Sequence, residues 1–248
     1  MWDESRRPAH WLKMDKGAGW PVFLFAVLIM VCAIPGINLL ADLNSRIVLP
    51  ESLGFIEQIF KEQEEAAAAL TERFLQADNA YQLLLNIGLM ALLPALAEEM
   101  TFRGTLQQLL ADSRQHSAFS SQPSEISHAA VWVTAIVFSA IHMQFYGFIP
   151  RMLLGALFGY MFVWTGSLWV PVVMHFTNNC LAVLAAFSIQ HSAFRCQPSD
   201  VSSTNIADTL GAGDTWWLGV LSLAAVGGLL WLFTSRGLRG FVRRTRTR

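Results

Sequence analysis

The chain has 248 residues, of which 54% are hydrophobic and 14% are charged, and its formal net charge is −1 at pH 7. A soluble domain carries about 25% charged residues, so this composition excludes an ordinary soluble protein and is typical of a membrane protein. Three cysteines without a CxxC spacing support neither a disulfide framework nor a zinc knuckle. Nothing in the composition indicates a nucleic acid, and we expect none among the partners.

Six stretches are apolar enough to cross a bilayer, whose core needs about 20 apolar residues in a helix. They predict an all-α fold, a polytopic transmembrane helical bundle that forms a single membrane domain over 1–248 and is surrounded by membrane lipid. The six predicted spans are Trp20 to Ala41, Tyr81 to Leu110, Ala130 to Ile149, Pro150 to Thr165, Leu168 to Ile189 and Trp216 to Phe233.

An acidic segment, 50–78, separates the first two predicted spans. Its apolar residues fall near helical spacing and have glutamates between them, which predicts an amphipathic helix outside the bilayer. These apolar residues are Phe55, Ile56, Ile59, Phe60, Leu70 and Phe74.

The placement of lysine and arginine predicts the orientation, because these residues accumulate on the cytoplasmic side of a membrane. An even number of spans puts both termini on the same side, and both terminal segments are basic. We therefore expect both termini in the cytoplasm, the acidic helix of 50–78 outside it, and a location in the bacterial cytoplasmic membrane. The basic residues are Arg6, Arg7, Lys13 and Lys16 at the N-terminus and the arginines of the tail 236–248.

The second predicted span contains two adjacent glutamates and an arginine. Charged side chains inside a bilayer cost about 2.5–3.5 kcal/mol each on insertion scales, so they are candidates for function. Glu99 and Arg103 are four residues apart and can pair on one helix face, whereas Glu98 lies about 100° around the helix. One carboxylate is thus neutralised and the other is available for chemistry. The alternative is that both glutamates lie at the water interface and simply end the helix.

Two further spans carry histidines with a partner four residues away. Phe138 and His142 share a face of the third span, and His175 and Asn179 share a face of the fifth. A lone histidine in an apolar helix is more often a hydrogen-bonded core residue than a catalyst, and an asparagine can simply bond to a neighbouring helix.

The depths of these side chains favour a common site. Glu98 lies about 18 Å along the helix from the predicted cytoplasmic end of its span, and His142 lies at a similar distance from the start of its own span. His175 and Asn179 follow the start of the fifth span. All four are expected to converge between the cytoplasmic half and the middle of the bilayer. In the fourth span, Gly155-x-x-x-Gly159 predicts close helix packing.

The order of these motifs resembles the CAAX-protease and bacteriocin-processing (CPBP, or Abi) family of intramembrane glutamic endopeptidases, in particular its bacterial branch. The similarity extends over about 86–185, which we expect to be the catalytic core. The motifs that carry it are EExxxR (Glu98, Glu99, Arg103), FxxxH (Phe138, His142) and HxxxN (His175, Asn179).

This resemblance implies an intramembrane endopeptidase that cleaves membrane-associated proteins or peptides. Glu98 would activate a water molecule with help from His142, and His175 and Asn179 would stabilise the oxyanion. Glu99 and Arg103, together with Phe138, would support the local geometry.

Three alternatives differ from this metal-free protease. Glu98, His142 and His175 could bind zinc, but the histidines lie on separate helices without the HExxH spacing, so we expect no cofactor. The chain could instead be a non-catalytic immunity or binding protein. A small proton-coupled transporter is the third alternative, and the absence of paired broken helices in two matching halves disfavours it.

Overall fold

The computed structural model describes residues 8–115, 127–193 and 210–235, and this part of the chain is all-helical. The predicted tail 236–248 lies outside the described residues. Segments η3 and η4 are π-helical, and η2 and η5 are short 3-10 turns. In chain order the helices are α1 (Pro8–Trp11), α2 (Trp20–Ser45), η2 (Glu51–Leu53), α3 (Gly54–Leu75), α4 (Ala80–Asn86), η3 (Ile87–Leu92), α5 (Leu93–Glu99), η4 (Met100–Leu106), α6 (Gln107–Gln115), α7 (His128–Ala140), α8 (Phe148–Thr165), α9 (Trp169–Ala193), η5 (Gly213–Thr215) and α11 (Trp216–Ser235).

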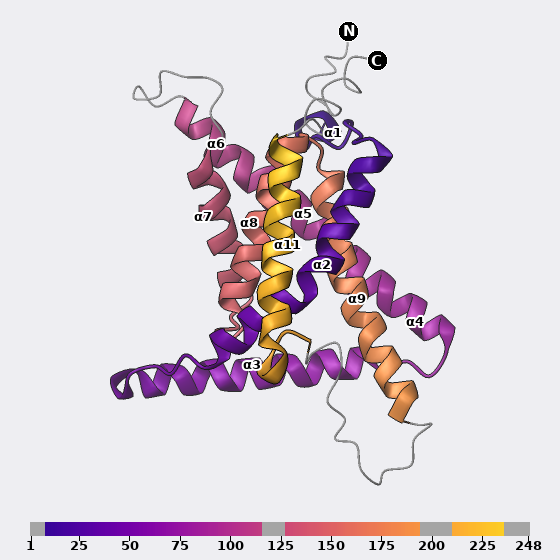
Figure 1. The fold of residues 1–248 in the computed structure, drawn as a ribbon. Helices are drawn as coiled ribbons and strands as arrows, with labels where there is room; N and C mark the ends of the chain where they lie inside the picture. Colours follow the sequence, from indigo (N-terminus) through magenta and orange to yellow (C-terminus); the bar gives the residue numbers. More distant parts are fainter. Residues whose placement is uncertain (1–7, 116–126, 194–209, 236–248) are drawn as a thin grey trace.

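The predicted all-α bundle is confirmed, and five of its helical segments are long and apolar enough to cross a membrane. Figure 1 shows these segments running roughly side by side, with α1 and the last turn of α11 at one end of the bundle and α3 across the other. The five segments are Trp20–Ser45, Ala80–Asp112, Phe148–Thr165, Trp169–His191 and Gly213–Ser235.

The third predicted span was wrong in its length. We expected a helix from Ala130 to Ile149, but α7 has only 13 residues and ends at Ala140. Met143 adopts a φ of 53°, a left-handed conformation that stops a right-handed helix. A turn over 141–147 then reverses the chain into α8, and the hydroxyl of Ser139 donates to the carbonyl of Phe148 across that turn at 2.7 Å.

The apolar core lies where α2 packs against α8, α9 and α11. Polar contacts fix the register between α2 and α11, since the backbone N–H of Gly36 donates to the hydroxyl of Ser222 at 3.0 Å. The buried core residues of this cluster include Val22, Ala26, Ile29, Met30, Phe158, Met161, Met174 and Phe233.

One long helix, from α4 to α6, is interrupted twice by the π-helical segments η3 and η4, which flank the two glutamates. Pro94 follows η3 and has no amide hydrogen, so it cannot donate to the carbonyl of Met90 four residues earlier. In η4 the hydroxyl of Thr105 donates to the carbonyl of Met100, five residues earlier, at 3.0 Å. Such wide turns occur frequently at functional sites because they redirect side chains.

The two glycines of α8 allow the close packing that their spacing predicted. A Cβ on Gly155 would lie 3.2 Å from the Phe138 ring, and one on Gly159 would lie 2.7 Å from Oε1 of Gln107. The close approach also exposes backbone carbonyls to neighbouring helices, since Gln107 donates its amide to the carbonyl of Gly159 at 3.2 Å. Helix α8 therefore contacts both α7 and the long helix that carries the glutamates.

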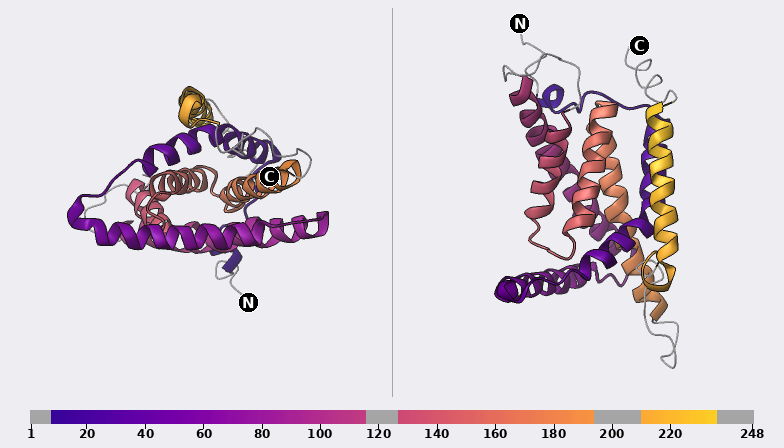
Figure 2. Two further views of the ribbon diagram at one scale, coloured as in Figure 1. Left: turned by 90° about the horizontal axis from the view of Figure 1, so that it is seen from below. Right: turned by 60° about the vertical axis from the view of Figure 1, so that its left-hand side comes forward.

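The predicted amphipathic helix is present as α3. It lies across the end of the bundle, nearly perpendicular to the spans, and in the view from below it extends along one side of the molecule (Figure 2). None of its residues is buried.

Candidate active site

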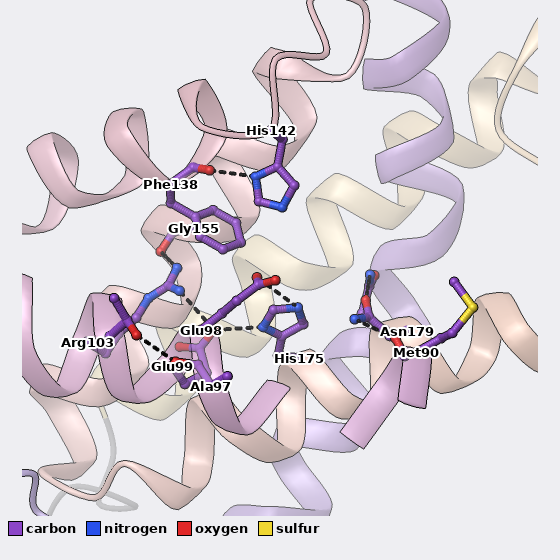
Figure 3. Close-up of polar contacts among 12 residues, drawn as sticks. Met90, Ala97, Glu98, Glu99, Arg103, Phe138, His142, Gly155, His175 and Asn179 are labelled. Carbon is purple, nitrogen blue, oxygen red and sulfur yellow. Dashed lines mark hydrogen bonds and ion pairs between the residues drawn. The ribbon is translucent and has the colours of Figure 1, made fainter. Parts of the chain in front are cut away.

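The glutamate–arginine pair predicted from the spacing is formed and completely buried. Nη1 of Arg103 lies 2.8 Å from Oε1 of Glu99, and both side chains are 0% exposed (Figure 3). The guanidinium also donates through Nη2 to the carbonyl of Gly155 at 2.8 Å. Its Cζ lies 4.7 Å from the centre of the Phe138 ring and 5.4 Å from that of Phe158. Arg103 thereby links its own helix to α7 and α8, and breaking the pair would leave an uncompensated buried charge.

His175 extends this ion pair towards the second glutamate. Its Nδ1 lies 2.8 Å from Oε1 of Glu99, and its Nε2 lies 3.8 Å from Oε2 of Glu98. The carboxylate of Glu99 is paired with Arg103 and can only accept, so Nδ1 of His175 carries a proton. The ring packs on Phe158 with centroids 5.6 Å apart, which fixes its plane. Nε2 is thereby directed at Glu98.

Glu98 and Glu99 are neighbours in the sequence but have different surroundings. The side chain of Glu98 is 29% exposed, whereas that of Glu99 is 0% exposed. Glu99 shares its Oε1 between Arg103 and His175, and Glu98 approaches only His175 among these groups. The carboxylate of Glu98 is therefore the more accessible of the two.

His142 lies in the turn just after α7 rather than within a span, at the α3 side of the bundle. Its Nδ1 is 2.7 Å from the carbonyl of Phe138, which can only accept, so this nitrogen carries the proton and Nε2 of the neutral ring is an acceptor. In Figure 3 the carboxylate of Glu98 lies between the rings of His142 and His175. His142 is near enough to both side chains for their charges to act on it.

Phe138 connects the two histidines and the buried arginine. Its ring meets that of His142 edge to face at 5.1 Å and that of His175 at 6.1 Å. The face of the same ring lies against the guanidinium of Arg103. The predicted supporting role of Phe138 thus has a physical basis in packing, because one side chain contacts both sides of the site.

Asn179 lies apart from the other site residues. Its amide nitrogen is 3.4 Å from the carbonyl of Met90, and its Oδ1 accepts from Asn178 at 3.2 Å. Pro94 has no amide hydrogen to donate to the Met90 carbonyl, so Asn179 supplies a donor to this interrupted helix. This contact points Asn179 along the long helix, away from Glu98 (Figure 3).

Sequence reasoning missed Arg151 in the first turn of α8. Its guanidinium donates to the side-chain carbonyl of Gln144, and it interacts electrostatically with Glu98 and with Glu64 of α3. Its Nη1 is buried and has no hydrogen-bond partner among the described residues. A signal was available, because Arg151 is a charged residue inside the fourth predicted span, the same criterion that identified Glu98.

The geometry of these residues also bears on the alternative of a zinc site. Across residues 8–115, 127–193 and 210–235, no three His, Cys, Asp or Glu side chains are arranged to hold a metal ion. Since Nδ1 of His175 is bonded to Glu99, only its Nε2 is available as a ligand, and that nitrogen lies 3.8 Å from Oε2 of Glu98. Glu98, His142 and His175 as arranged therefore do not fit a zinc site, and the expectation of a site without a cofactor remains a prediction.

Comparisons with known proteins agree with the motifs at this site. Residues 80–181 match the family described as type II CAAX prenyl endopeptidase Rce1-like. The matched segment covers less than half of the chain. It includes every residue of the three motifs, and the expected core of 86–185 overlaps it.

One curated relative is "Uncharacterized protein YpbD" of Bacillus subtilis (strain 168). It is 33% identical over 95 residues, which are 37% of this chain and 40% of that protein. The chain thus spans less than half the length of the relative that it matches. No solved structure matches the chain.

Together with five apolar helices of spanning length, the Rce1-like match supports an integral membrane protein.

Proposed function

We propose that this protein is an intramembrane endopeptidase in which Glu98 activates a water molecule to hydrolyse a peptide bond. The observation that supports this most is the difference in burial and pairing between the two glutamates. Glu99 is buried and paired, whereas Glu98 is partly exposed and has a histidine nitrogen 3.8 Å away. A general base needs an accessible carboxylate that a structural ion pair has not neutralised.

In this mechanism Glu98 accepts a proton from water as the water attacks the scissile carbonyl. Nε2 of His142 is an acceptor in the tautomer that Phe138 selects, so it can orient the same water through its second hydrogen. The tetrahedral intermediate then collapses when the proton on Glu98 moves to the leaving amine.

His175 is the candidate donor to the oxyanion. Since Nδ1 is committed to Glu99, His175 can donate from Nε2 only as an imidazolium, with protons on both nitrogens. The carboxylate of Glu99 accepts from Nδ1 of His175, and Arg103 holds that carboxylate in place. One preorganised oxyanion donor is worth about 2.7–4 kcal/mol.

Asn179 can donate to the oxyanion only if its amide leaves the Met90 carbonyl. That hydrogen bond is long, at 3.4 Å, and therefore weak enough to be replaced by one to the oxyanion.

The substrates are membrane-associated peptides or proteins, because the reactive carboxylate lies within a bundle of membrane-spanning length. We further propose that both termini are cytoplasmic and that α3 is outside. The residues joined to α1 and α11 are rich in arginine and lysine, whereas α3 is rich in glutamate. His142 follows the α3 end of α7, so this orientation opens its side of the site towards the outer leaflet.

The test is cleavage of a membrane-anchored peptide by the purified full chain in lipid nanodiscs. Wild type should cleave, and Glu98→Ala should not. Persistent cleavage by Glu98→Ala would remove Glu98 as the base. A wild type that binds the peptide without cleaving it would instead favour a non-catalytic binding protein.

A further inference from the structure

Helix α3 has two distinct faces besides its charged one. Residues spaced three or four apart are half-buried against the bundle, among them Glu57, Phe60 and Glu64. Ile59 precedes Phe60 and therefore points about 100° away from that face. It belongs to an exposed apolar stripe, with exposures from 38% for Ile59 to 56% for Leu70. The stripe consists of Ile56, Ile59, Ala66, Leu70 and Phe74.

The bundle-facing side of α3 contacts the turn that carries His142. The ring of Phe60 stacks on that of Phe145 at 5.5 Å and 3°. Glu64 accepts from the backbone N–H of Tyr146 at 3.3 Å, and Glu57 accepts from its hydroxyl at 3.2 Å. These contacts lie three and four residues after His142.

Two neighbouring side chains add to the contacts that hold this turn. Lys61 lies 2.8 Å from Glu57 and lowers the pKa of that carboxyl group, so Glu57 remains an ionised acceptor for Tyr146 at neutral pH. From the end of α2, Asn44 donates to the carbonyl of Phe145 at 2.8 Å, and this asparagine is buried.

The position of α3 indicates what covers its apolar stripe. The preceding span ends at Ser45 and the next begins at Ala80, so α3 is tied to the membrane surface at both of its ends. It lies across the spans rather than along them (Figures 1 and 2). The opposite face carries Glu65 and Glu72. A flat helix with one apolar and one acidic face fits the boundary between lipid and water.

We propose that α3 is an interfacial helix whose stripe lies in the lipid of the membrane that the bundle spans, and that it holds the turn of His142 through Tyr146. Tyr146 is then a positioning residue that acts through His142. The lipid contact stands independently, and the positioning role rests on the proposed function.

The lipid contact can be tested with nitroxide labels on opposite faces of α3. Leu70→Cys and Glu72→Cys would be placed in the full chain with its native cysteines replaced, and each protein put at one copy per phosphatidylcholine nanodisc. Two residues of helix separate the labels by about 200°. The label at 70 should be relaxed by oxygen, which concentrates in lipid, and the label at 72 by a water-soluble nickel chelate.

Two results would overturn the lipid contact. One is equal access of the nickel chelate to both labels. The other is shielding of the label at 70 only when two copies share a nanodisc, because the stripe would then bind a second copy of this chain.

The positioning role can be tested with Tyr146→Phe, which removes only the hydroxyl that donates to Glu57. A net hydrogen bond is worth about 0.5–1.5 kcal/mol, so kcat should fall about threefold to tenfold while KM is unchanged. The pH dependence of kcat should also shift, because a displaced His142 titrates differently.

The matched control is Tyr81→Phe, since Tyr81 is exposed on α4. If both variants share one kcat and one pH profile, Tyr146 has no positioning role. If wild type cleaves no peptide, both the proposed function and the positioning role are contradicted. The accessibility of the two labels still decides the lipid contact.

Discussion

On one side of the candidate site, Arg103, Glu99 and His175 form a continuous chain of buried polar contacts between spanning helices. On the other side, His142 lies in a turn whose contacts come largely from a helix outside the spans. The first side is held by contacts between buried side chains, and the second is held by contacts with α3 at the end of the bundle. We infer that substitutions on the buried side affect stability and activity together, whereas those on the turn side affect activity alone.

The largest effect is expected from Glu98→Gln. Loss of the general base should lower kcat by about 10²–10⁴-fold, while the thermal unfolding temperature stays near that of wild type. Peptide cleavage and differential scanning fluorimetry on the same preparation check both parts. An unfolding temperature that drops as far as in Glu99→Gln would show that the two glutamates are not divided between chemistry and structure.

Arg103→Met should destabilise the protein by about 3–5 kcal/mol, because it leaves the carboxylate of Glu99 buried without its partner. The double variant Arg103→Met with Glu99→Gln should recover much of that loss. Unfolding in detergent at increasing denaturant measures the difference. If the single and double variants are equally unstable, the charge of Glu99 is not what the arginine compensates.

His142→Gln should lower kcat about 10²-fold and leave the free energy of unfolding nearly unchanged, since the ring is outside the buried chain of Arg103, Glu99 and His175. The comparison with His175→Gln is decisive, because that variant also loses the bond to Glu99 and should unfold more easily. Equal stability losses at the two histidines would contradict the division between the two sides.

Arg151→Gln should reduce cleavage about tenfold, because it removes a positive charge that interacts electrostatically with Glu98. Arg151→Lys retains the charge and should recover part of the activity. If lysine and glutamine behave alike, the contact with Gln144 matters and the charge does not.

The smallest effect is expected from metal chelators. Incubation with 1,10-phenanthroline should leave cleavage unchanged, since the side chains of Glu98, His142 and His175 are not arranged to bind one metal ion. Inactivation that added zinc reverses would establish the metal-dependent alternative.

Spacing within one helix predicted the pairing of Glu99 with Arg103, because four residues return to the same face. It could not predict that His175 bonds to Glu99, since no local rule says which residues of two distant helices meet. The end of α7 was missed for a similar reason. Its apolar residues continue into Ile141, and only the left-handed Met143 stops the helix. The catalytic roles of the motif residues remain predictions.

The π-helical turns around the glutamates also bear on how such a site could arise or be lost. A π-turn contains one residue more than the α-helix it interrupts. Because the wide turn absorbs its extra residue locally, deleting one residue from η4 would restore regular α-helical pitch with little rotation of the helix beyond it, and Gln107 would keep the Gly159 carbonyl. The side chains inside the turn, Arg103 among them, would change direction and leave their partners. A single in-frame codon loss would thus disarm the site while the bundle and both acidic residues remain.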